Sequence, residues 1–314
     1  MQVLQVKNLR KYFTVGMLKK YTIKALDDVS FNINQGEIFG VIGESGCGKS
    51  TLGLVLSRIE KETAGEIFFK GKRISGSIKM DTDTRRQIQI IFQNPYESFD
   101  QRLSIYDSLI IPLRINKIGD SDSQRKEIMK TFLHRAGLEP AESFLDRYPH
   151  ELSGGQLQRI SLLRAMMLNP SFLIADECVS MLDLSVRASV INLMLDLVKS
   201  EKTTVMFITH DISLARYVSD QIAVLYLGKI VEMGRSVDVV QRPLHPYTQV
   251  LISYSPSIFE KKNKIKPKEL MSLFQPEVGC NFMNRCPYAH NRCEEEKPQL
   301  RELEPGHWVS CHKV

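Results

Sequence analysis

One glycine-rich stretch constrains the fold of this chain more than any other part of the sequence. It reads Gly43-Glu44-Ser45-Gly46-Cys47-Gly48-Lys49-Ser50 and fits the pattern G-x-x-x-x-G-K-S of a phosphate-binding loop. The apolar segment 37–42 before it predicts a buried strand, and the segment 51–56 after it predicts the start of a helix. In this order, backbone N–H groups and a helix N-terminus can surround phosphate oxygens. We therefore expect a nucleoside triphosphate here, with Lys49 reaching its β- and γ-phosphates and Ser50 holding Mg²⁺.

Short apolar segments alternate with helical patterns over much of the chain. This alternation indicates an α/β protein with a largely parallel sheet covered on both faces. Residues 2–35 instead read as β-rich, and the region from about 95 to 163 reads as a helical insert in the α/β core. The predicted strands are 65–69, 88–92, 172–175, 203–208 and 221–226, and the predicted helices are 124–136, 156–168 and 184–199.

Composition and charge exclude several classes of protein. The net charge of +6 suits an anionic ligand but is no signature of nucleic-acid binding. No stretch approaches the roughly 18 consecutive apolar residues of a membrane span. The first residues, 1–7, lack the apolar region of a secretion signal. We therefore expect a cytosolic protein that meets a membrane only through partners.

Two further motifs lie downstream of the phosphate loop. The predicted strand 172–175 runs into Asp176 and Glu177, where Asp176 is placed to bind Mg²⁺ and Glu177 to act as general base. The segment 152–156 reads Leu-Ser-Gly-Gly-Gln and predicts a second anion-binding helix start, with Ser153 as a hydroxyl donor. One nucleotide does not need two such helix starts from the same subunit. This surplus indicates a site shared between two subunits.

With these motifs the chain resembles the ATPase subunits of ATP-binding cassette (ABC) transporters, over residues 1 to about 250. The resemblance implies a P-loop NTPase whose domain, 1–255, has a RecA-like core, an antiparallel β subdomain and an inserted helical subdomain. It also implies ATP and Mg²⁺ as ligands. Many relatives have proline after the Asp-Glu pair, whereas this chain has Cys178. We expect that position to be one of packing, without loss of hydrolysis.

The resemblance also implies roles for single residues. Gln93 would sense Mg²⁺ and the attacking water, and His210 would contact the γ-phosphate. The signature segment, Leu152–Gln156, would cap the γ-phosphate bound by the opposite subunit, with Asp183 at the dimer seam. An aromatic residue would stack on adenine; Phe13 aligns best, with Tyr12 as the alternative. The predicted catalytic residues are Glu177, His210 and Gln93. The predicted magnesium ligands are Ser50, Gln93 and Asp176. The predicted nucleotide-binding residues are Phe13, Gly43, Glu44, Ser45, Gly46, Cys47, Gly48, Lys49, Ser50, Thr51, Ser153, Gly155, Gln156 and Asp183.

The C-terminal part narrows the resemblance to one branch of the family. The segment 245–252 and the tail 279–312 are similar to the corresponding segments of the oligopeptide, dipeptide and nickel importer branch. We therefore expect residues 256–314 to form a linker, with a basic surface run at 260–268, followed by a small cysteine-rich extension.

Four cysteines crowd that extension, and three interpretations of them stay open. They are separated by five, six and seventeen residues, which is not the C-x-x-C spacing of a zinc ribbon. Irregularly spaced four-cysteine sets can hold a [4Fe–4S] cluster, and some members of the branch resemble this chain in carrying one. Zn²⁺ is the second interpretation, with His290, His307 or His312 as reserve ligands, and reduced thiols packed around Trp308 are the third. The four are Cys280, Cys286, Cys293 and Cys311.

The resemblance implies the ATP-hydrolysing subunit of an importer for oligopeptides or dipeptides, peripheral to the cytoplasmic face of the cell membrane. Its partners would be a second ABC ATPase in a heterodimer, two transmembrane permeases that dock on the helical insert and residues 93–100, and an extracytoplasmic peptide-binding protein. The alternative is the ATPase of a nickel or metal-chelate importer, which has the same cassette. ABC ATPases acting on ribosomes or DNA commonly carry two cassettes or a long coiled coil, exporters usually carry fused membrane spans, and a phosphate-loop kinase would not explain residues 152–156.

Overall fold

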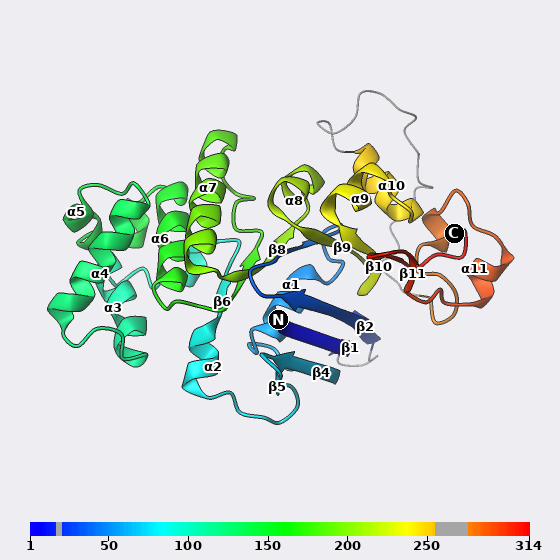
Figure 1. Ribbon diagram of the computed structural model, residues 1–314, viewed down its shortest axis with the longest axis horizontal. Coiled ribbons are helices and arrows are strands. Elements are labelled where there is room, and N and C mark those ends of the chain that lie inside the picture. Colours follow the sequence, from blue (N-terminus) through cyan, green and yellow to red (C-terminus); the bar gives the residue numbers. More distant parts are fainter. Residues whose placement is uncertain (17–20, 255–275) are drawn as a thin grey trace. The chain divides into compact units, whose positions relative to one another are not determined.

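The computed structural model describes residues 1–16, 21–254 and 276–314 (Figure 1). The chain divides into two compact units, the first formed by 1–78 with 206–314 and the second by 79–205. The predicted basic run at 260–268 lies outside the described residues. Across the described ranges, no helix is long and apolar enough to span a bilayer.

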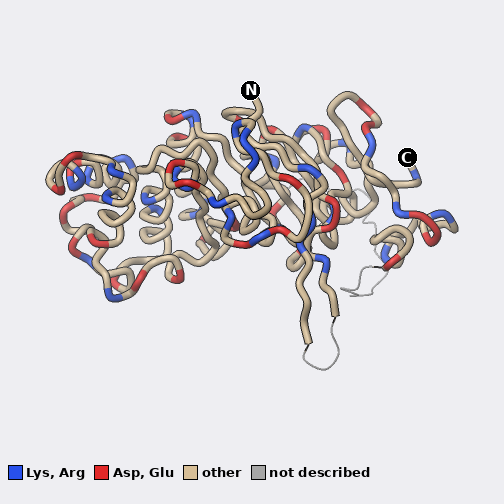
Figure 2. Tube along the Cα trace, turned by 90° about the horizontal axis from the view of Figure 1, so that it is seen from below, with Lys and Arg blue, Asp and Glu red and all other residues tan. Residues whose placement is uncertain are grey.

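The first unit begins with a four-stranded antiparallel sheet, which confirms the predicted β-rich start. Its strand order is β2-β1-β4-β5. The strands β1 and β2 are each 14 residues long, and their far ends extend as a two-stranded ribbon that Figure 2 shows in profile. Apolar alternation covers only the inner part of β1, where Val3, Leu4, Val6 and Leu9 are buried, so the pattern predicted only the start of the strand. The strands are β1 (Gln2–Val15), β2 (Tyr21–Asn34), β4 (Ala64–Phe69) and β5 (Lys72–Arg73).

The second sheet of this unit is mixed, with strands in the order β11-β12-β10-β9-β3-β8. β3 and β9 pair in parallel, as predicted, whereas β9, β10, β12 and β11 pair antiparallel. A two-residue turn explains the first reversal: Leu227 and Gly228 both have positive φ (42° and 75°), the geometry of a tight hairpin. The elements are β3 (Ile38–Ile42), α1 (Lys49–Leu56), β8 (Thr204–Thr209), α8 (Ile212–Val218), β9 (Gln221–Tyr226), β10 (Lys229–Arg235), α9 (Ser236–Gln241), α10 (Pro246–Ser253), α11 (Asn291–Glu295), β11 (Arg301–Glu304) and β12 (His307–Val309).

The second unit is mostly helical and contains the parallel pair β6 (Ile88–Ile91) and β7 (Phe172–Asp176). The predicted helices at 124–136, 156–168 and 184–199 are confirmed with boundaries shifted by two residues or fewer. A helix at 105–115 was not predicted, and it carries Pro112 in its interior. The helices are α2 (Thr82–Gln87), α3 (Ile105–Ile115), α4 (Asp122–Arg135), α5 (Ala141–Leu145), α6 (Gly154–Met166) and α7 (Leu184–Glu201), with short 3-10 turns at Pro95–Ser98 and Pro149–Glu151.

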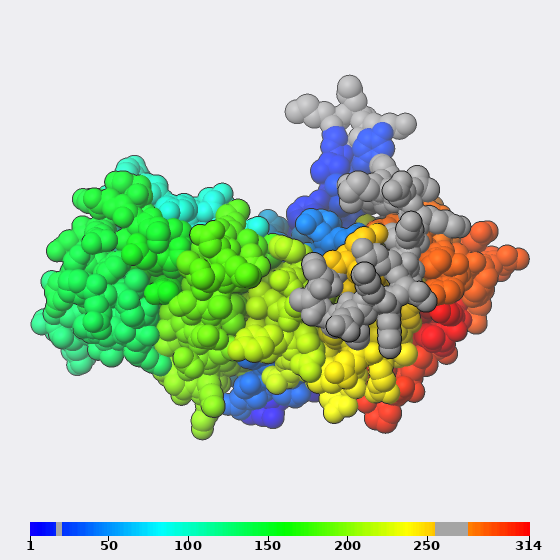
Figure 3. All heavy atoms as spheres, turned by 90° about the horizontal axis from the view of Figure 1, so that it is seen from above, coloured from blue at the N-terminus to red at the C-terminus, as the bar shows by residue number. Residues whose placement is uncertain are grey.

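The described part of the C-terminal extension, 276–314, is built into the first unit. Its strand β12 pairs with β10, and its Phe282 is 1% exposed within a cluster of core residues from β9, β10 and α10. His307 bonds through Nε2 to the fully buried carboxylate of Glu232 at 2.8 Å. Figure 3 shows the same relationship in space: the orange and red residues of the extension lie against the yellow residues of α9 and α10. The extension therefore shares the core of the first unit.

Candidate nucleotide-binding site

The phosphate loop, Gly43–Thr51, connects β3 to α1 and has the predicted strand, turn and helix context. Gly43 and Gly48 have φ of +156° and +110°. A Cβ on Gly43 would lie 2.2 Å from the carbonyl oxygen of Leu225, and one on Gly48 would lie 2.2 Å from that of Ala25. The backbone of β9 thus lies against the loop at Gly43, and the backbone of β2 lies against it at Gly48. Only glycine fits at these two positions, because any side chain would collide with backbone that cannot move aside.

Lys49 is folded back over its own loop. Its side chain is buried, and Nζ donates hydrogen bonds to the carbonyl oxygens of Gly43 at 2.8 Å and Glu44 at 3.0 Å. Ser50 is exposed in the first turn of α1, and Thr51 beside it is half-buried. The ammonium group and the hydroxyl therefore lie at the start of the helix, where an anion and its metal ion are favoured.

Glu44 ties the phosphate loop to two later parts of the chain. Its backbone N–H donates to the hydroxyl of Tyr247 on α10 at 2.8 Å. Its carboxylate accepts two hydrogen bonds from the guanidinium of Arg285 in the C-terminal extension, both of 2.7 Å. No sequence pattern indicated either contact, since about 200 residues or more separate the partners. The Arg285–Glu44 pair is a bidentate ion pair, the strongest geometry for these groups.

Cys47 fills a packing position inside the loop. The thiol is buried, and burial raises its pKa to about 11. The loop residues Ser45 and Gly46 are exposed. A thiol with this pKa stays protonated at neutral pH, so Cys47 is not a reactive thiolate.

The two aromatic candidates for adenine stacking are neighbours on β1. The Tyr12 hydroxyl donates to the Asp27 carboxylate at 2.6 Å, and burial followed by this hydrogen bond raises the Tyr12 pKa to about 12. The Phe13 ring lies 4.6 Å from Nζ of Lys11 in a cation–π contact. Adjacent residues of a strand point to opposite faces, so only one of the two rings can serve the nucleotide. The assignment to Phe13 stays a prediction.

His210 lies immediately after β8 and is exposed, in the turn that leads into α8. The next residue, Asp211, caps α8 by accepting hydrogen bonds from the backbone N–H groups of Ser213 and Leu214. The cap fixes the strand-to-helix turn that carries His210.

In the second unit, Asp176 is the last residue of β7 and is 7% exposed. Glu177 follows with φ of +44°, in the left-handed region, and is half-buried. Ser180 closes this turn by donating to the Glu177 carbonyl from both its N–H and its hydroxyl. Cys178 is 4% exposed, which is consistent with the predicted packing role, and burial raises its pKa to about 12.

The signature segment forms the start of α6. Ser153 accepts a hydrogen bond from the Gln156 N–H at 3.3 Å, and Gln156 accepts one from the Ser153 N–H at 3.0 Å, a reciprocal capping box. A Cβ on Gly155 would lie 2.4 Å from Cγ1 of Val186 on α7, whereas one on Gly154 would be 3.7 Å from its nearest neighbour. The glycine at 155 thus lets α6 and α7 approach closely.

Asp183 is the residue before α7, and its neighbours form an apolar surface. Met181 is 63% exposed and Leu184 is 81% exposed. These are among the most exposed large apolar side chains of the described chain. Such a patch is typical of a surface that a partner covers.

The turn after β6, Gln93–Asp100, is connected to the signature segment. Gln93 is exposed two residues beyond β6. The Tyr96 hydroxyl donates to the carbonyl of Leu152 at 2.9 Å, and Arg164 on α6 donates to the carbonyl of Ser98 at 2.8 Å. The second unit thus brings Gln93, Asp176, Glu177, Asp183 and the signature segment into one compact body, while the first unit holds the phosphate loop, Phe13 and His210.

The four cysteines of the extension gather in one place. The thiols of Cys280, Cys286 and Cys293 interact electrostatically with one another and with that of Cys311, and the Cys280 N–H donates to the Cys293 carbonyl at 2.7 Å. Burial raises the pKa of Cys280 to about 11 and also raises those of Cys286 and Cys311. Within the described ranges, no group of three or more His, Cys, Asp or Glu side chains is arranged to hold a metal ion.

Comparison with known proteins agrees with this geometry. The ABC transporter family model matches residues 26–180, and the model of the oligopeptide/dipeptide transporter C-terminal region matches residues 231–293. The dimeric, ADP- and Pi-bound ATP-binding cassette MJ0796 is 30% identical, with a TM-score of 0.66, and the match covers 74% of this chain and 98% of that one. The ATP-binding cassette cbiO1 from Clostridium perfringens is 26% identical, with a TM-score of 0.65, over 77% of this chain and 91% of that one. The fold and its phosphate loop are those of an ABC ATPase, a protein that binds and hydrolyses ATP.

Curated relatives identify the branch. The putative oligopeptide transport ATP-binding protein YkfD of Bacillus subtilis is 43% identical over 99% of this chain and 95% of its own length. The di/tripeptide transport ATP-binding protein DppF of Pseudomonas aeruginosa is 42% identical over 99% of this chain and 97% of its own length. The chain belongs to the family of ABC transporter ATP-binding proteins that carry the oligopeptide/dipeptide transporter C-terminal region.

Proposed function

We propose that this chain is the ATP-hydrolysing subunit of an ABC importer that takes up oligopeptides or dipeptides across the cytoplasmic membrane. The observation that carries the proposal is the joining of two matched regions in one chain. The ABC region, 26–180, contains the phosphate loop, and the C-terminal region, 231–293, contributes Tyr247 and Arg285 to the contacts around that loop. The peptide-transport names of YkfD and DppF support the choice of solute.

The roles in hydrolysis would be those that the resemblance to ABC ATPases implies. Lys49 would bind the β- and γ-phosphates, and Ser50, Gln93 and Asp176 would provide the Mg²⁺ site. Glu177 would accept the proton of the attacking water as general base. His210 would contact the γ-phosphate, and Phe13 would stack on adenine.

Two ATPase subunits would act together across a shared seam. The capping box of the signature segment fixes a helix N-terminus that would meet the γ-phosphate of the opposite subunit. The exposed Met181 and Leu184, which flank Asp183, support a covered seam at this place. The partner would be a second ABC ATPase, and we favour a heterodimer.

The membrane partners would meet the chain at the docking turn, Gln93–Asp100. Two permeases would hold the ATPase pair at the cytoplasmic face of the membrane, and an extracytoplasmic binding protein would deliver the peptide. Because Tyr96 and Ser98 of this turn are bonded to Leu152 and Arg164, a movement of a permease would reach the signature segment. Basic and acidic residues are interspersed along the trace in Figure 2, a distribution that does not favour nucleic acid as a partner.

The four thiols of the extension would hold a [4Fe–4S] cluster. What supports a cluster is the mutual proximity of the four thiols. A [4Fe–4S] cluster takes four thiolates, and when bound it would cross-link the extension and supply one-electron redox chemistry. Anaerobic purification with iron and sulfide assays tests this: about four of each per chain support the cluster, whereas zinc or no metal refutes it. Cys280→Ser should lose the iron, and Cys178→Ser, outside the extension, should keep it.

The alternative solute is nickel or a metal chelate, since the same cassette serves both branches. Affinity purification of the tagged chain from membranes in mild detergent, without oxygen, followed by mass spectrometry, separates the cases. Recovery of a second ATPase, two permeases and a peptide-binding protein supports peptide import. Recovery of a metal-chelate binding protein in place of the peptide-binding protein favours the alternative. Co-purification with ribosomes or with DNA-associated proteins overturns the transport function.

A further inference from the structure

The phosphate loop contains a carboxylate in a place that should weaken binding of a triphosphate. Glu44 is the second residue of the loop, and its side chain is 41% exposed. An uncompensated negative charge near a polyanionic ligand is repulsive, and partial burial increases that repulsion. The loop therefore needs either a neutral Glu44 or a cation that compensates it.

Arg285 supplies that cation from the C-terminal extension. Its side chain is 20% exposed and makes both hydrogen bonds to the Glu44 carboxylate, so the pair is more shielded from water than an ordinary surface ion pair. The hydrogen bond to Glu44 also makes the largest contribution to the raised pKa of Arg285. The guanidinium carries a full positive charge under all physiological conditions.

The position of Arg285 is fixed by the core of the first unit. Arg285 lies in the 3-10 turn Met283–Arg285, and its guanidinium lies 5.8 Å from the ring of Tyr226 and 5.7 Å from that of Phe282. The Phe282 ring in turn packs 5.5 Å from that of Tyr247, the residue that holds the Glu44 backbone.

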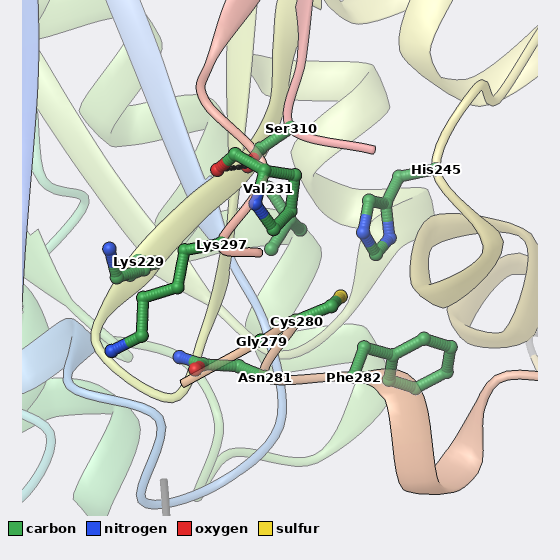
Figure 4. A pocket seen from close by; sticks show the side chains of 10 residues that line it. Lys229, Val231, His245, Gly279, Cys280, Asn281, Phe282, Lys297 and Ser310 are labelled. Carbon is green, nitrogen blue, oxygen red and sulfur yellow. Dashed lines mark hydrogen bonds between the residues drawn. The ribbon is translucent and has the colours of Figure 1, made fainter. Parts of the chain in front are cut away.

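Little space is left between the segment before this turn and the core of the first unit. Residues 279–282 face His245 and Val231 across a cavity of about 20 Å³, which has room for about one water molecule (Figure 4). The extension meets the core by direct packing here, since Phe282 is 1% exposed. Arg285 is therefore presented to the loop by a turn that is anchored in the core.

We propose that Arg285 is a positioning residue of the ATP site, which neutralises Glu44 and thereby allows the phosphate loop to bind the triphosphate tightly. The proposal rests on the function assigned to the phosphate loop. The loop backbone is already held by Tyr247 and by Lys49, so the particular contribution of Arg285 is its charge. The C-terminal extension thus takes part in nucleotide binding, besides completing a sheet.

The charge argument predicts an asymmetric pattern of variants. Arg285→Gln leaves Glu44 charged beside the triphosphate and should raise the Kd for ATP by about five- to tenfold. Glu44→Gln removes the repulsive group, leaves the positive charge of Arg285 in place, and should lower the Kd for ATP by about two- to fivefold. The double variant Glu44→Gln/Arg285→Gln should return to within about twofold of the wild type, because neither charge remains.

The measurement is ATP affinity of the full-length chain by titration calorimetry, with KM and kcat of hydrolysis measured in parallel. For Arg285→Gln the effect should appear in KM with kcat unchanged, the mark of lost ground-state binding. Arg292→Gln is the matched control, since Arg292 pairs with the exposed Glu296 on the same extension. Arg285→Lys keeps the charge, so its Kd for ATP should stay within about threefold of the wild type. This variant also tests the proposal if Arg285→Gln does not fold.

Three results would overturn the proposal: an unchanged Kd for Arg285→Gln, equal weakening by Glu44→Gln and Arg285→Gln without recovery in the double variant, or a Kd for Arg285→Lys as weak as that for Arg285→Gln. Lys49→Ala keeps the loop assignment separate from the proposal. If Lys49→Ala abolishes ATP binding and Arg285→Gln changes nothing, the ATP site stands and the role of Arg285 fails. If Lys49→Ala binds ATP like the wild type, the loop assignment fails and the role of Arg285 fails with it.

Discussion

The hydroxyl of Tyr96 donates a 2.9 Å hydrogen bond to the backbone carbonyl of Leu152, and so joins the docking turn after β6 to the signature segment at the start of α6. The two residues are 56 positions apart in the sequence. Arg164 strengthens the same junction, since its guanidinium lies 4.1 Å from the ring of Phe99 and bonds to the Ser98 carbonyl. The turn proposed to dock a permease and the segment proposed to meet the γ-phosphate are therefore bonded directly to each other within the second unit.

Tyr96→Phe should uncouple the permeases from the ATPase while sparing ATP binding. The change removes one hydrogen bond and leaves the Leu152 carbonyl without this donor, a cost of about 1 kcal/mol in the free energy of unfolding. We expect permease-stimulated ATPase activity in the reconstituted transporter to fall about three- to tenfold, because the docking turn is no longer tied to the signature segment. Tyr148→Phe is the control, since that ring is exposed and stacks on His150. Equal stimulation of Tyr96→Phe and wild type would argue against this route.

Gly155→Ala should separate α6 from α7. The new Cβ would lie 2.4 Å from Cγ1 of Val186, so a helix or a rotamer must shift, at a cost of about 1–3 kcal/mol in the free energy of unfolding. Gly154→Ala is the matched control, because its Cβ would meet only an ordinary contact at 3.7 Å. Urea unfolding measures both, and Val186→Ala in the Gly155→Ala background should recover most of the loss. Equal stability of the two alanine variants would contradict the packing explanation.

Glu177→Gln should stop hydrolysis without stopping ATP binding. The amide cannot accept the proton of the attacking water, so kcat should fall by about 10²–10⁴-fold while the Kd for ATP stays within about twofold. Single-turnover hydrolysis and nucleotide titration measure the two effects separately. Glu142→Gln, an exposed carboxylate paired with Lys130 on another part of the same unit, should behave as the wild type. Turnover at the wild-type rate in Glu177→Gln would remove Glu177 from the base role.

Cys47 and Cys178 should resist alkylation in the native protein. Burial raises their pKa values to about 11 and about 12, whereas the ordinary value is near 9, so less thiolate exists at any pH below these values. At pH 8 about one Cys47 thiol in a thousand is ionised, and labelling should be at least about 100-fold slower than in the urea-unfolded chain. Between pH 8 and 10 the native rate should rise about tenfold per pH unit, while the unfolded rate levels off above pH 9. Peptide mapping after timed iodoacetamide treatment gives both rates, and native labelling at the unfolded rate would contradict the burial of these thiols.

Local chemistry made much of the site predictable. The glycines at 43 and 48, the lysine at 49 and the Ser-Gly-Gly run at 153–155 act over a few residues, so their spacing alone indicated a phosphate loop and a second helix start. Buried strands such as β7 and β9 were equally visible, because an uninterrupted apolar run has few alternatives when it is short and bounded by turns. The antiparallel strand β12 was not predicted. It is only three residues long and forms by pairing with β10, about 75 residues away in the sequence.

The sequence by itself determined the class of protein, the phosphate loop, the signature segment and the branch indicated by the C-terminal part. Only the tertiary structure decided that Arg285 neutralises Glu44, that Tyr96 holds Leu152, and that the four thiols of the extension gather in one place. The reason is physical. A motif consists of residues that are neighbours along the chain. The Arg285–Glu44 pair spans 241 positions, so it forms only after β9, β10 and α10 have packed against Phe282 and brought the two side chains within 2.7 Å.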